Sequence, residues 1–545
     1  MEFSEFDVIN LTRIFPFKLD TFQFCFNIQF FQTKMDLEED GIDVEMSVHP
    51  DSISSVGISA EEAAGNYEMA GSRVEADLSV ISWGKFRHLY NPETEKLIDC
   101  VLKDLKIPRL YEFQEIFLHA IGNKRDVFAV AGTGSGKTEA TGIASLLLRK
   151  VFDEPTGVTV MFVPLTGIIW ELFDNDKIPT IAVDIGGQMY GKKNGLRVLL
   201  CEDDVLSGDY VRLIMHPESL MNNQVEALML KLKINQKILG VFIDEFHIML
   251  PRHWQSFRPE MEEQTGRLRV FLRKGAPTGA LSATATQEDV SMTNQTLGLK
   301  SEPVLLAENP LQSHFKFVMM QRQSDNYGFD GYMDQNSKFH PGLLDQLKLI
   351  YIDEYVRCIE DKQEPKHAII FFRTESQLIN LLNYLRQTLC VSSASHAPFV
   401  SLVASTPKVT EMVIRSRAGS ISLYLSTQKM LMGLNIPRLQ ICIFVKPMNM
   451  IHTVIQGAGR TGRPLPDQIG FRARSLVYIL ANGGDVGGQV KGMSEEMKNF
   501  VNLKNGCLRS YLGRYFLGNS VQAQTISDWC CSHCSSVFRL QGPVV

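Results

Sequence analysis

The sequence predicts an α/β fold in which two parallel-sheet domains, each flanked by helices, are followed by a small helical segment that carries cysteines. Three observations predict this fold. The chain has 545 residues, which is too long for one hydrophobic core. From about Trp83, short apolar runs alternate with helical patterns. These runs form two series, separated by a polar stretch at about 321–338.

Composition and charge place the chain among ordinary globular proteins. Hydrophobic residues make up 44% of it and charged residues 21%. No run approaches the ~18 apolar residues that a membrane span requires, so we expect no membrane partner. The formal net charge is −6, but residues 36–77 hold twelve acids and one base and residues 1–35 add −1, which leaves +6 on residues 78–545. A mildly basic folded part permits a polyanionic partner such as nucleic acid.

The first 82 residues predict a disordered leader rather than a domain. Residues 36 to about 80 are acidic and weakly periodic, and such a composition cannot bury enough apolar surface to fold. Residues 1–34 are unusually rich in phenylalanine. We treat them as a spurious or poorly folded extension, a hypothesis that a mass spectrum of the natural protein tests.

The apolar runs have the length of strands in a buried parallel sheet. The first series comprises residues 127–130, 158–163, 213–215, 239–243 and 279–281. The second comprises residues 368–372, 421–425, 441–445 and 476–480. We therefore place the two domains at 83–305 and 306–482, and the helical tail at 483–545.

A glycine-rich loop follows the first strand. Residues 131–138 read Ala-Gly-Thr-Gly-Ser-Gly-Lys-Thr, and a helical pattern follows at Glu139–Leu148. In this order the glycines let backbone N–H groups point at a phosphate, and the helix N-terminus adds partial positive charge. The alternative is a chance glycine-rich turn, since Ala131 stands where the usual pattern has glycine. We expect ATP phosphates and Mg²⁺ to be bound by Gly132, Thr133, Gly134, Ser135, Gly136, Lys137 and Thr138.

The strand at 239–243 ends in two adjacent carboxylates, Asp244 and Glu245. Open parallel sheets bind ligands at the carboxyl ends of their strands, which places these acids beside the phosphate loop. We expect Asp244 to hold Mg²⁺ and Glu245 to orient or deprotonate the attacking water. The alternative is a solvated strand end.

A second glycine-rich turn, Gln456–Arg463, carries two arginines three residues apart, Arg460 and Arg463. A forked guanidinium suits a phosphate whose charge shifts during hydrolysis, so we group Gln456 and both arginines with the catalytic residues. The alternative is a basic surface turn.

Taken together, these motifs resemble those of superfamily 2 helicases in order and spacing. The segments that carry the resemblance are Ala131–Thr138, Asp244–His247, Ser282–Thr284 and Gln456–Arg463. Further segments resemble the RecQ family within that superfamily: Phe113–Gln114, Pro217–Glu218, His253–Glu260 and Thr427–Pro437. The resemblance covers about Trp83–Cys534. It implies two RecA-like lobes that use ATP to move 3′ to 5′ along single-stranded DNA and to unwind forked duplexes, in DNA repair or recombination. From the DNA substrate alone we expect the protein in the nucleus.

The resemblance also implies roles for single residues. Gln114 is expected to read the adenine edge, and Arg463 to act as the arginine finger with Arg460 beside it. DNA is expected to bind at His253, Trp254, Phe257 and Arg258. Aromatic faces that stack on unpaired bases suit this role, although a Trp and Phe three apart are by themselves more often core residues. His247 is the expected relay between that loop and ATP, with a structural histidine as the alternative.

Most of the ten cysteines are scattered singly in apolar context, which is typical of an intracellular protein. Near the C-terminus, however, Cys531–Cys534 forms a short knuckle of the kind that holds zinc. The resemblance implies a zinc subdomain, with Cys507, Cys530, Cys531 and Cys534 as ligands. Since two adjacent cysteines rarely bind one ion, His533 substitutes or a ligand is missing; the alternative is a set of reduced thiols without metal.

Several departures from the RecQ pattern bear on activity. Phe246 is bulky for its position, the segment His247–Trp254 is about two residues longer than usual, and the chain stops eleven residues after Cys534, without a winged-helix domain. These departures motivate a second hypothesis, a degenerate copy that binds nucleic acid or a protein partner with little unwinding. An RNA-directed helicase is the third. The sequence names no protein partner.

Overall fold

The structure is a computed structural model, and its described residues belong to one compact unit of the chain, Ser72–Val545. The description covers residues 81–545 except 133, 165, 176, 251–266, 269, 272–274, 300–301, 309, 312–313, 323–329, 331, 334–338, 341, 373, 392–396, 403–419, 428–435, 437, 463–473, 483–484, 486–492, 505, 518–529 and 535–545.

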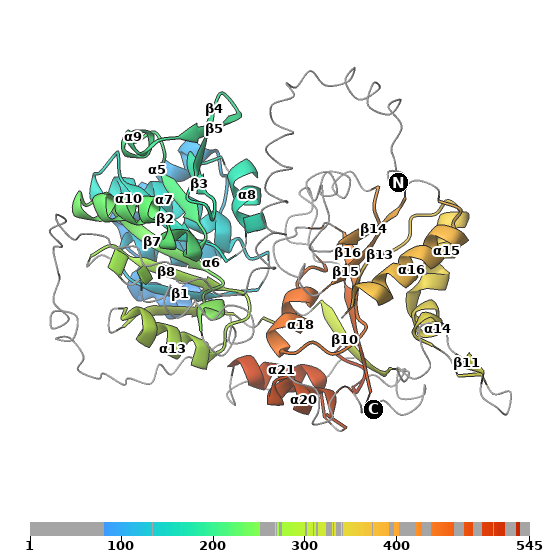
Figure 1. Cartoon of the computed structure of the whole chain (residues 1–545). Helices are drawn as coiled ribbons and strands as arrows, with labels where there is room; N and C mark the ends of the chain where they lie inside the picture. Colours follow the sequence, from blue (N-terminus) through green and yellow to red (C-terminus); the bar gives the residue numbers. More distant parts are fainter. Residues whose placement is uncertain are drawn as a thin grey trace, which may run out of the picture. The chain divides into compact units, whose positions relative to one another are not determined.

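The first lobe is built on a nine-stranded sheet with the order β5-β4-β3-β6-β2-β7-β8-β1-β9 (Figure 1). Its strands are β1 Val127–Val130, β2 Val158–Phe162, β3 Thr180–Val183, β4 Met189–Lys193, β5 Leu196–Leu200, β6 Arg212–Met215, β7 Ile238–Asp244, β8 Thr278–Ser282 and β9 Val304–Ala307. From β3 to β9 in this order the strands are parallel, whereas β4 and β5 extend the β3 edge as an antiparallel hairpin.

Successive side chains of a strand point to opposite faces of the sheet, so this lobe has two hydrophobic cores, one on each face. In β1, Phe128 and Val130 belong to one core, while Val127 and Ala129 belong to the other. Helices cover both faces: α10 packs into the first core, and α6 and α7 pack into the second (Figure 1). The helices are α4 Trp83–Phe86, α5 Pro92–Leu105, α6 Glu112–Gly122, α7 Lys137–Phe152, α8 Thr166–Asn175, α9 Glu202–Leu206, α10 Asn223–Ile234 and α13 Gln287–Leu297, with 3₁₀ turns η1 Arg87–Leu89, η2 Pro217–Met221 and η3 Phe246–Met249.

The second lobe is built on a six-stranded parallel sheet with the order β10-β17-β16-β13-β15-β14. It too has a core on each face, to which alternate residues of β13 contribute. Its strands are β10 Phe315–Gln321, β13 His367–Phe372, β14 Phe399–Leu402, β15 Leu423–Thr427, β16 Leu439–Phe444 and β17 Ser475–Ala481, with a small hairpin of β11 Tyr332–Met333 and β12 Phe339–His340. Its helices are α14 Leu343–Leu347, the π-turn η5 Lys348–Ile352, α15 Asp353–Glu360, α16 Glu375–Thr388 and α18 Ile451–Ala458.

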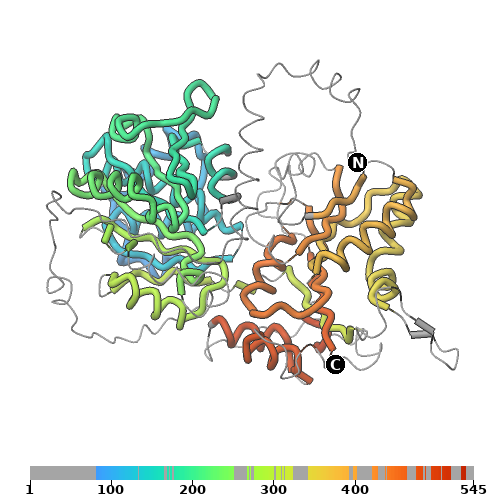
Figure 2. The backbone as a smooth tube through the Cα atoms, in the orientation of Figure 1, coloured from blue at the N-terminus to red at the C-terminus, as the bar shows by residue number. Residues whose placement is uncertain are grey.

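The C-terminal helices share the core of this second lobe. Helix α20 spans Glu495–Val501 and α21 spans Leu508–Leu517. Their apolar side chains, among them Phe500 and Leu512, join the core that contains β10 and α18. The cysteine knuckle docks there as well, since Cys531 pairs with Phe317 of β10 and the Ser532 amide donates to the Phe317 carbonyl oxygen at 2.8 Å. Figure 2 shows the backbone of the second lobe from yellow to orange, with the C-terminal helices in red.

The fold class that the sequence predicts is confirmed, and every predicted strand is present to within two residues. The strands that were not predicted from the sequence are β3, β4, β5, β9, β10, β11, β12 and β14. Of the predicted leader, residues 1–82, all but the last two residues lie outside the described residues. Within the described part of the chain, no helix combines the length and apolar character that crossing a membrane demands.

Candidate functional site

The loop after β1 has the geometry of a phosphate-binding loop. Gly134 and Gly136 adopt φ values of 78° and 81°, in the left-handed region that disfavours other residues. Helix α7 then begins at Lys137, whose Nζ donates to the carbonyl oxygens of Ala131 at 2.6 Å and Gly132 at 3.0 Å. The loop therefore curls around the ammonium group. Thr133 lies outside the described residues.

Gln114 ties helix α6 to this loop. Its side chain is 1% exposed. Its Oε1 accepts from the Tyr111 amide at 2.9 Å, while its Nε2 donates to the Gly136 carbonyl oxygen at 3.2 Å and to Glu139 Oε2 at 3.1 Å. The residue predicted to read adenine therefore lies directly against the phosphate loop.

Asp244 and Glu245 lie at the same edge of the sheet as the loop. Strand β8 pairs with both β1 and β7, so the carboxyl ends of these three strands meet. Burial, and then the charge of Glu245, raise the pKa of Asp244 to about 7, and the nearby positive charge of Lys137 opposes the shift. Burial also raises the pKa of Glu245, with Lys137 again opposing. The two carboxylates thus share a confined site with the loop lysine.

Glu245 is further fixed by its backbone and by Ser282. Its φ is 50°, a left-handed conformation that is uncommon for a residue with a side chain. The Ser282 hydroxyl lies 3.4 Å from Glu245 Oε2 and 2.8 Å from His247 Nδ1. The sequence analysis used Ser282 only as part of a resemblance, whereas the structure makes it a neighbour of both residues.

The second lobe contributes Gln456, on α18, and Arg460, two residues after the end of that helix. The positive charge of Arg460, like that of Lys137, opposes the rise in the pKa of Glu245 that burial causes, so the guanidinium is close enough to interact with that carboxylate. Gln456 is buried within α18. Arg463, the predicted arginine finger, lies outside the described residues. The predicted DNA-binding residues His253, Trp254, Phe257 and Arg258 also lie outside them.

One residue at this site was missed by the sequence analysis. His452 lies on α18 and is 4% exposed, and its Nδ1 is 2.6 Å from the Thr284 carbonyl oxygen. A buried polar residue among the apolar side chains of this helix, such as Ile451 and Val454, was the available signal.

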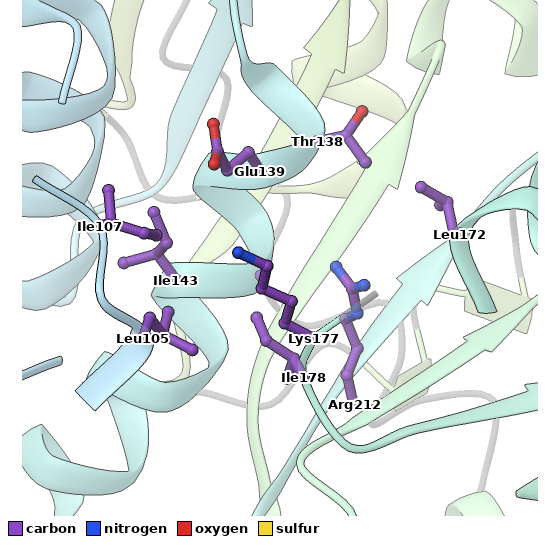
Figure 3. A pocket seen from close by; sticks show the side chains of 10 residues that line it. Leu105, Ile107, Thr138, Glu139, Ile143, Leu172, Lys177, Ile178 and Arg212 are labelled. Atoms are coloured by element: carbon purple, nitrogen blue, oxygen red, sulfur yellow. The ribbon is translucent and has the colours of Figure 1, made fainter. Parts of the chain in front are cut away.

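A cavity of about 260 Å³ opens beside the first turn of α7. In Figure 3 the apolar side chains of Leu105, Ile107 and Ile143 gather on one side of it, and Arg212 lies on the other. The remaining lining residues are Thr138, Glu139, Gly142, Leu172, Lys177 and Ile178. Since Thr138 is also part of the phosphate loop, the cavity adjoins the place where phosphates would bind.

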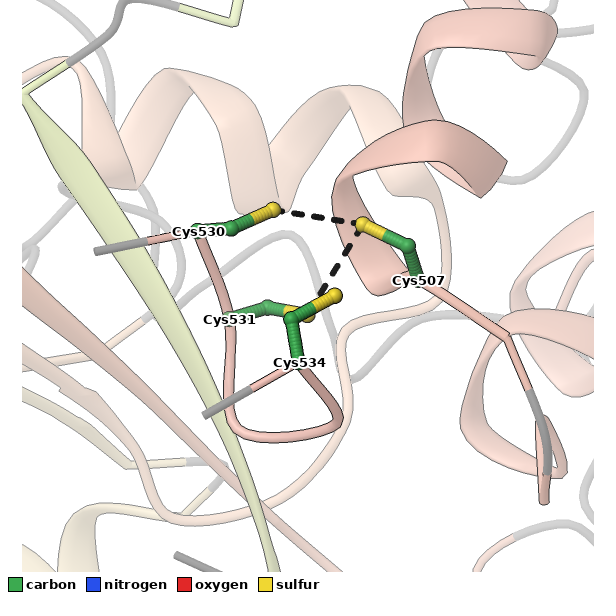
Figure 4. Close-up of side chains that lie close together, drawn as sticks. All are labelled: Cys507, Cys530, Cys531 and Cys534. Carbon is green, nitrogen blue, oxygen red and sulfur yellow. Dashed lines mark hydrogen bonds between the residues drawn. The ribbon is translucent and has the colours of Figure 1, made fainter. Parts of the chain in front are cut away.

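Four cysteines converge at the C-terminus, one from the residue before α21 and three from the knuckle (Figure 4). The Sγ atoms of Cys507, Cys530, Cys531 and Cys534 all lie within 4.8 Å of one another. A tetrahedral zinc site with Zn–S distances of about 2.3 Å requires sulfurs about 3.8 Å apart, so the cluster fits zinc. Hydrogen bonds from Cys530 and Cys531 hold the pKa of the Cys507 thiol far below its usual value, whereas the same contacts raise the pKa of Cys530, so without a metal the cluster shares its protons unequally.

The adjacent pair Cys530 and Cys531 therefore does converge on one point. We expected His533 to substitute for a cysteine or a ligand to be missing, and neither alternative is what the structure shows. The Nδ1 of His533 instead lies 2.9 Å from the Gly506 carbonyl oxygen. The turn of the knuckle directs both neighbouring sulfurs inward, which the spacing alone does not reveal.

Comparisons with known proteins identify helicase domains in both lobes. Residues 111–293 match the DEAD/DEAH box helicase family, and residues 348–464 match the helicase conserved C-terminal domain. No curated protein gave a sequence match.

Solved helicase structures share the fold. The DUF1998 helicase MrfA bound to DNA and AMPPNP is 16% identical with a TM-score of 0.53, over 72% of this chain and 51% of MrfA. This chain therefore spans about half the length of MrfA. The DEAD-box helicase Mss116 bound to ssRNA and UDP-BeF is 15% identical with a TM-score of 0.52, over 74% of this chain and 76% of Mss116. At these identities the likeness concerns the fold alone.

Proposed function

This chain carries both core domains of a superfamily 2 helicase, and on that premise we propose that it is an ATP-dependent DNA helicase of RecQ type. The helicase core supports nucleic-acid-dependent ATP hydrolysis. The proposal adds DNA as the substrate, 3′ to 5′ movement along single strands, and separation of forked duplexes.

The observation that carries the hydrolytic part is the convergence of Lys137, Asp244, Glu245 and Arg460. In this proposal Lys137 binds the β- and γ-phosphates of ATP and Asp244 holds Mg²⁺, which would neutralise phosphate charge when bound. Glu245 is the group to orient the attacking water, because burial raises its pKa and makes it a better proton acceptor. Arg460 is proposed to stabilise charge near the transferred phosphate.

The cavity beside α7 is where we place the nucleoside. Its apolar walls suit the faces of a purine, and it adjoins the phosphate loop at Thr138. Gln114 lies against the same loop, which supports its proposed contact with the adenine edge.

Support for DNA, and for the RecQ type, comes from the segment that contains Trp254 and from the cysteine tail. Trp254 and Phe257 are proposed to stack on unpaired bases and to couple them to hydrolysis. The cysteine cluster fits a structural zinc ion, which we propose as a third cofactor beside ATP and Mg²⁺. Nuclear residence and a role in DNA repair or recombination remain predictions from the proposed substrate.

The test is ATP hydrolysis by the purified chain with no nucleic acid, with single-stranded DNA and with RNA of equal length, using Lys137→Ala as the blank. We expect strong stimulation by DNA and weaker stimulation by RNA. Stronger stimulation by RNA would reverse the choice of substrate. Forked duplexes with a 3′ or a 5′ tail then test polarity, and only the 3′-tailed fork should unwind.

A second candidate is a degenerate copy that binds nucleic acid without unwinding it. It is favoured by Phe246, whose fully buried ring packs against Phe128 with centroids 5.3 Å apart next to the catalytic carboxylates. Nucleic-acid binding without any stimulation of hydrolysis would favour this candidate. The variant Trp254→Ala distinguishes them further, because in a working motor it should bind ATP normally and lose stimulation.

A further inference from the structure

His452 is enclosed by aromatic rings from two other elements, η3 and α21. It lies on α18, and its ring is parallel to that of His247, with centroids 5.6 Å apart and an interplanar angle of 12°. On its other sides, Tyr515 and Phe516 of α21 present edges to it, each with centroids 5.5 Å away. The hydrolytic roles proposed above leave this residue unused.

Two hydrogen bonds define the state of the imidazole. The Thr284 carbonyl oxygen can only accept, so His452 Nδ1, 2.6 Å away, carries the hydrogen and donates. In the neutral ring Nε2 is then an acceptor, and the Tyr515 hydroxyl, 2.8 Å away, donates to it. His452 thus joins the C-terminal helix to the segment that follows β8.

That segment leads directly to the catalytic carboxylate. The Thr284 amide donates to the Ser282 hydroxyl at 3.1 Å, and this hydroxyl contacts His247 Nδ1 and Glu245 Oε2. In the other direction, Tyr515 lies near the end of α21, whose first residue, Leu508, immediately follows the cysteine Cys507. A continuous set of contacts therefore runs from the cysteine cluster to Glu245.

We infer that His452 is a positioning residue for ATP hydrolysis, through which the C-terminal helix α21 holds Thr284 and Ser282 in place beside Glu245. This inference rests on the proposed function, because it concerns the same hydrolytic site. The bond from Nδ1 to Thr284 fixes the second lobe against the β8 segment, and the bond from Tyr515 keeps the ring in the orientation that makes that contact. Loss of either bond leaves ATP binding intact and slows the chemical step.

Replacement of His452 by asparagine or by glutamine tests its two hydrogen bonds one at a time. An asparagine amide reproduces the donor at the Nδ1 position, whereas a glutamine amide reaches the Nε2 position. In nucleic-acid-stimulated hydrolysis we expect His452→Ala and His452→Gln to lower kcat about tenfold, as loss of one hydrogen bond does, with KM for ATP unchanged within about twofold. His452→Asn should stay within about threefold of the wild type. Tyr515→Phe removes only the hydroxyl and should lower kcat about threefold.

His367→Asn is the matched control, since His367 is also 4% exposed and lies on β13 of the same lobe. It should leave kcat unchanged. A wild-type kcat in His452→Ala would overturn the inference. So would equal losses in the alanine, asparagine and glutamine variants, because the ring would then act only by filling space. Normal turnover in Tyr515→Phe would show that α21 does not act on the site through the Tyr515 hydroxyl. Absence of nucleic-acid-stimulated hydrolysis in the wild type would instead refute the proposed function, before any variant is compared.

Discussion

Gln114 and Gly136 are in direct contact: Nε2 of the glutamine donates to the glycine carbonyl oxygen at 3.2 Å, and a Cβ added to the glycine would lie 2.4 Å from that same nitrogen. The phosphate loop is thus shaped by a side chain from α6 as well as by its own backbone. This contact is possible only because residue 136 has no side chain.

Gly136→Ala should therefore impair nucleotide binding beyond the cost of backbone strain. Gly195, in the turn between β4 and β5, has a similar φ of 77° but open space around it, which makes Gly195→Ala the control. Both variants should lose about 1–2 kcal/mol of stability from the left-handed backbone. Only Gly136→Ala should also weaken ATP affinity, by about tenfold or more, in a fluorescent-nucleotide titration. Equal affinities in the two variants would contradict this account.

Lys137→Ala should abolish turnover and spare nucleic-acid binding. The ammonium lies within the phosphate loop, and no other described residue of that loop supplies a positive side chain. We expect kcat to fall more than about 100-fold, as when a preorganised charge is removed from a transition state. Lys150→Ala, at the other end of α7 where Lys150 pairs with Asp104, should retain normal turnover. Substantial ATP hydrolysis by the Lys137 variant would show that this loop does not bind the phosphates during turnover.

Asp244→Asn should raise stability while it removes activity. The pKa of Asp244 in the folded protein is about 7, above its value of about 4 in an unfolded chain. The folded state therefore binds this proton more tightly, so the carboxylate costs stability progressively as pH rises from about 4 to about 7. At pH 8, without nucleotide or Mg²⁺, the free energy of unfolding in urea should be about 2 kcal/mol higher in the variant than in the wild type. This gain is smaller than the full pKa shift implies, because both carboxylates stay partly exposed to solvent.

At pH 4.5 most of that gain should disappear. Asp104→Asn, at an exposed acid, is the control and should show no such dependence. A variant less stable than the wild type at pH 8 would mean that the Asp244 carboxylate is stabilised rather than strained by its surroundings. Magnesium should narrow the difference at pH 8, because it binds only the wild-type carboxylate.

The cysteine cluster should bind one zinc ion per chain, measured by elemental analysis after dialysis. Removal of the metal by a chelator should lower the melting temperature by about 5 °C or more, because a site worth ~2 kcal/mol has that effect in a domain of this size. Cys534→Ser should reproduce the loss, and Cys390→Ser, at an exposed cysteine, should not. If the wild-type chain contains no metal and its melting temperature does not respond to chelator, the four cysteines are reduced thiols that bind no metal.

Elements can be predicted from the sequence where burial leaves an unambiguous pattern. Strands such as β7 are buried on both faces and read as continuous apolar runs, so both lobes and the acidic strand end could be located. The hairpin of β4 and β5 is largely exposed and mixes lysine, glycine and arginine with leucine. Its signal was the Asn194–Gly195 pair, which favours a two-residue hairpin turn.

Other features depend on contacts that a sequence does not contain. Ser282 and His452 gain their roles only when strand β8 and helix α18 are brought together. The convergence of Cys530 and Cys531 likewise depends on the pairing of the knuckle with β10. Spacing identifies which residues are chemically able to act, whereas the three-dimensional fold decides which of them meet.

The pairing of Cys531 and Ser532 with β10 has a consequence for handling this protein. Strand β10 is the outermost strand of its sheet and carries Phe315, Phe317 and Met319, and the knuckle occupies its outer side. A chain cut after residue 482 would expose these main-chain hydrogen-bonding groups beside apolar side chains, a template for aggregation. The cysteine knuckle thus also protects the edge strand β10 from aggregation. Fragments meant to isolate the second lobe should extend through Cys534.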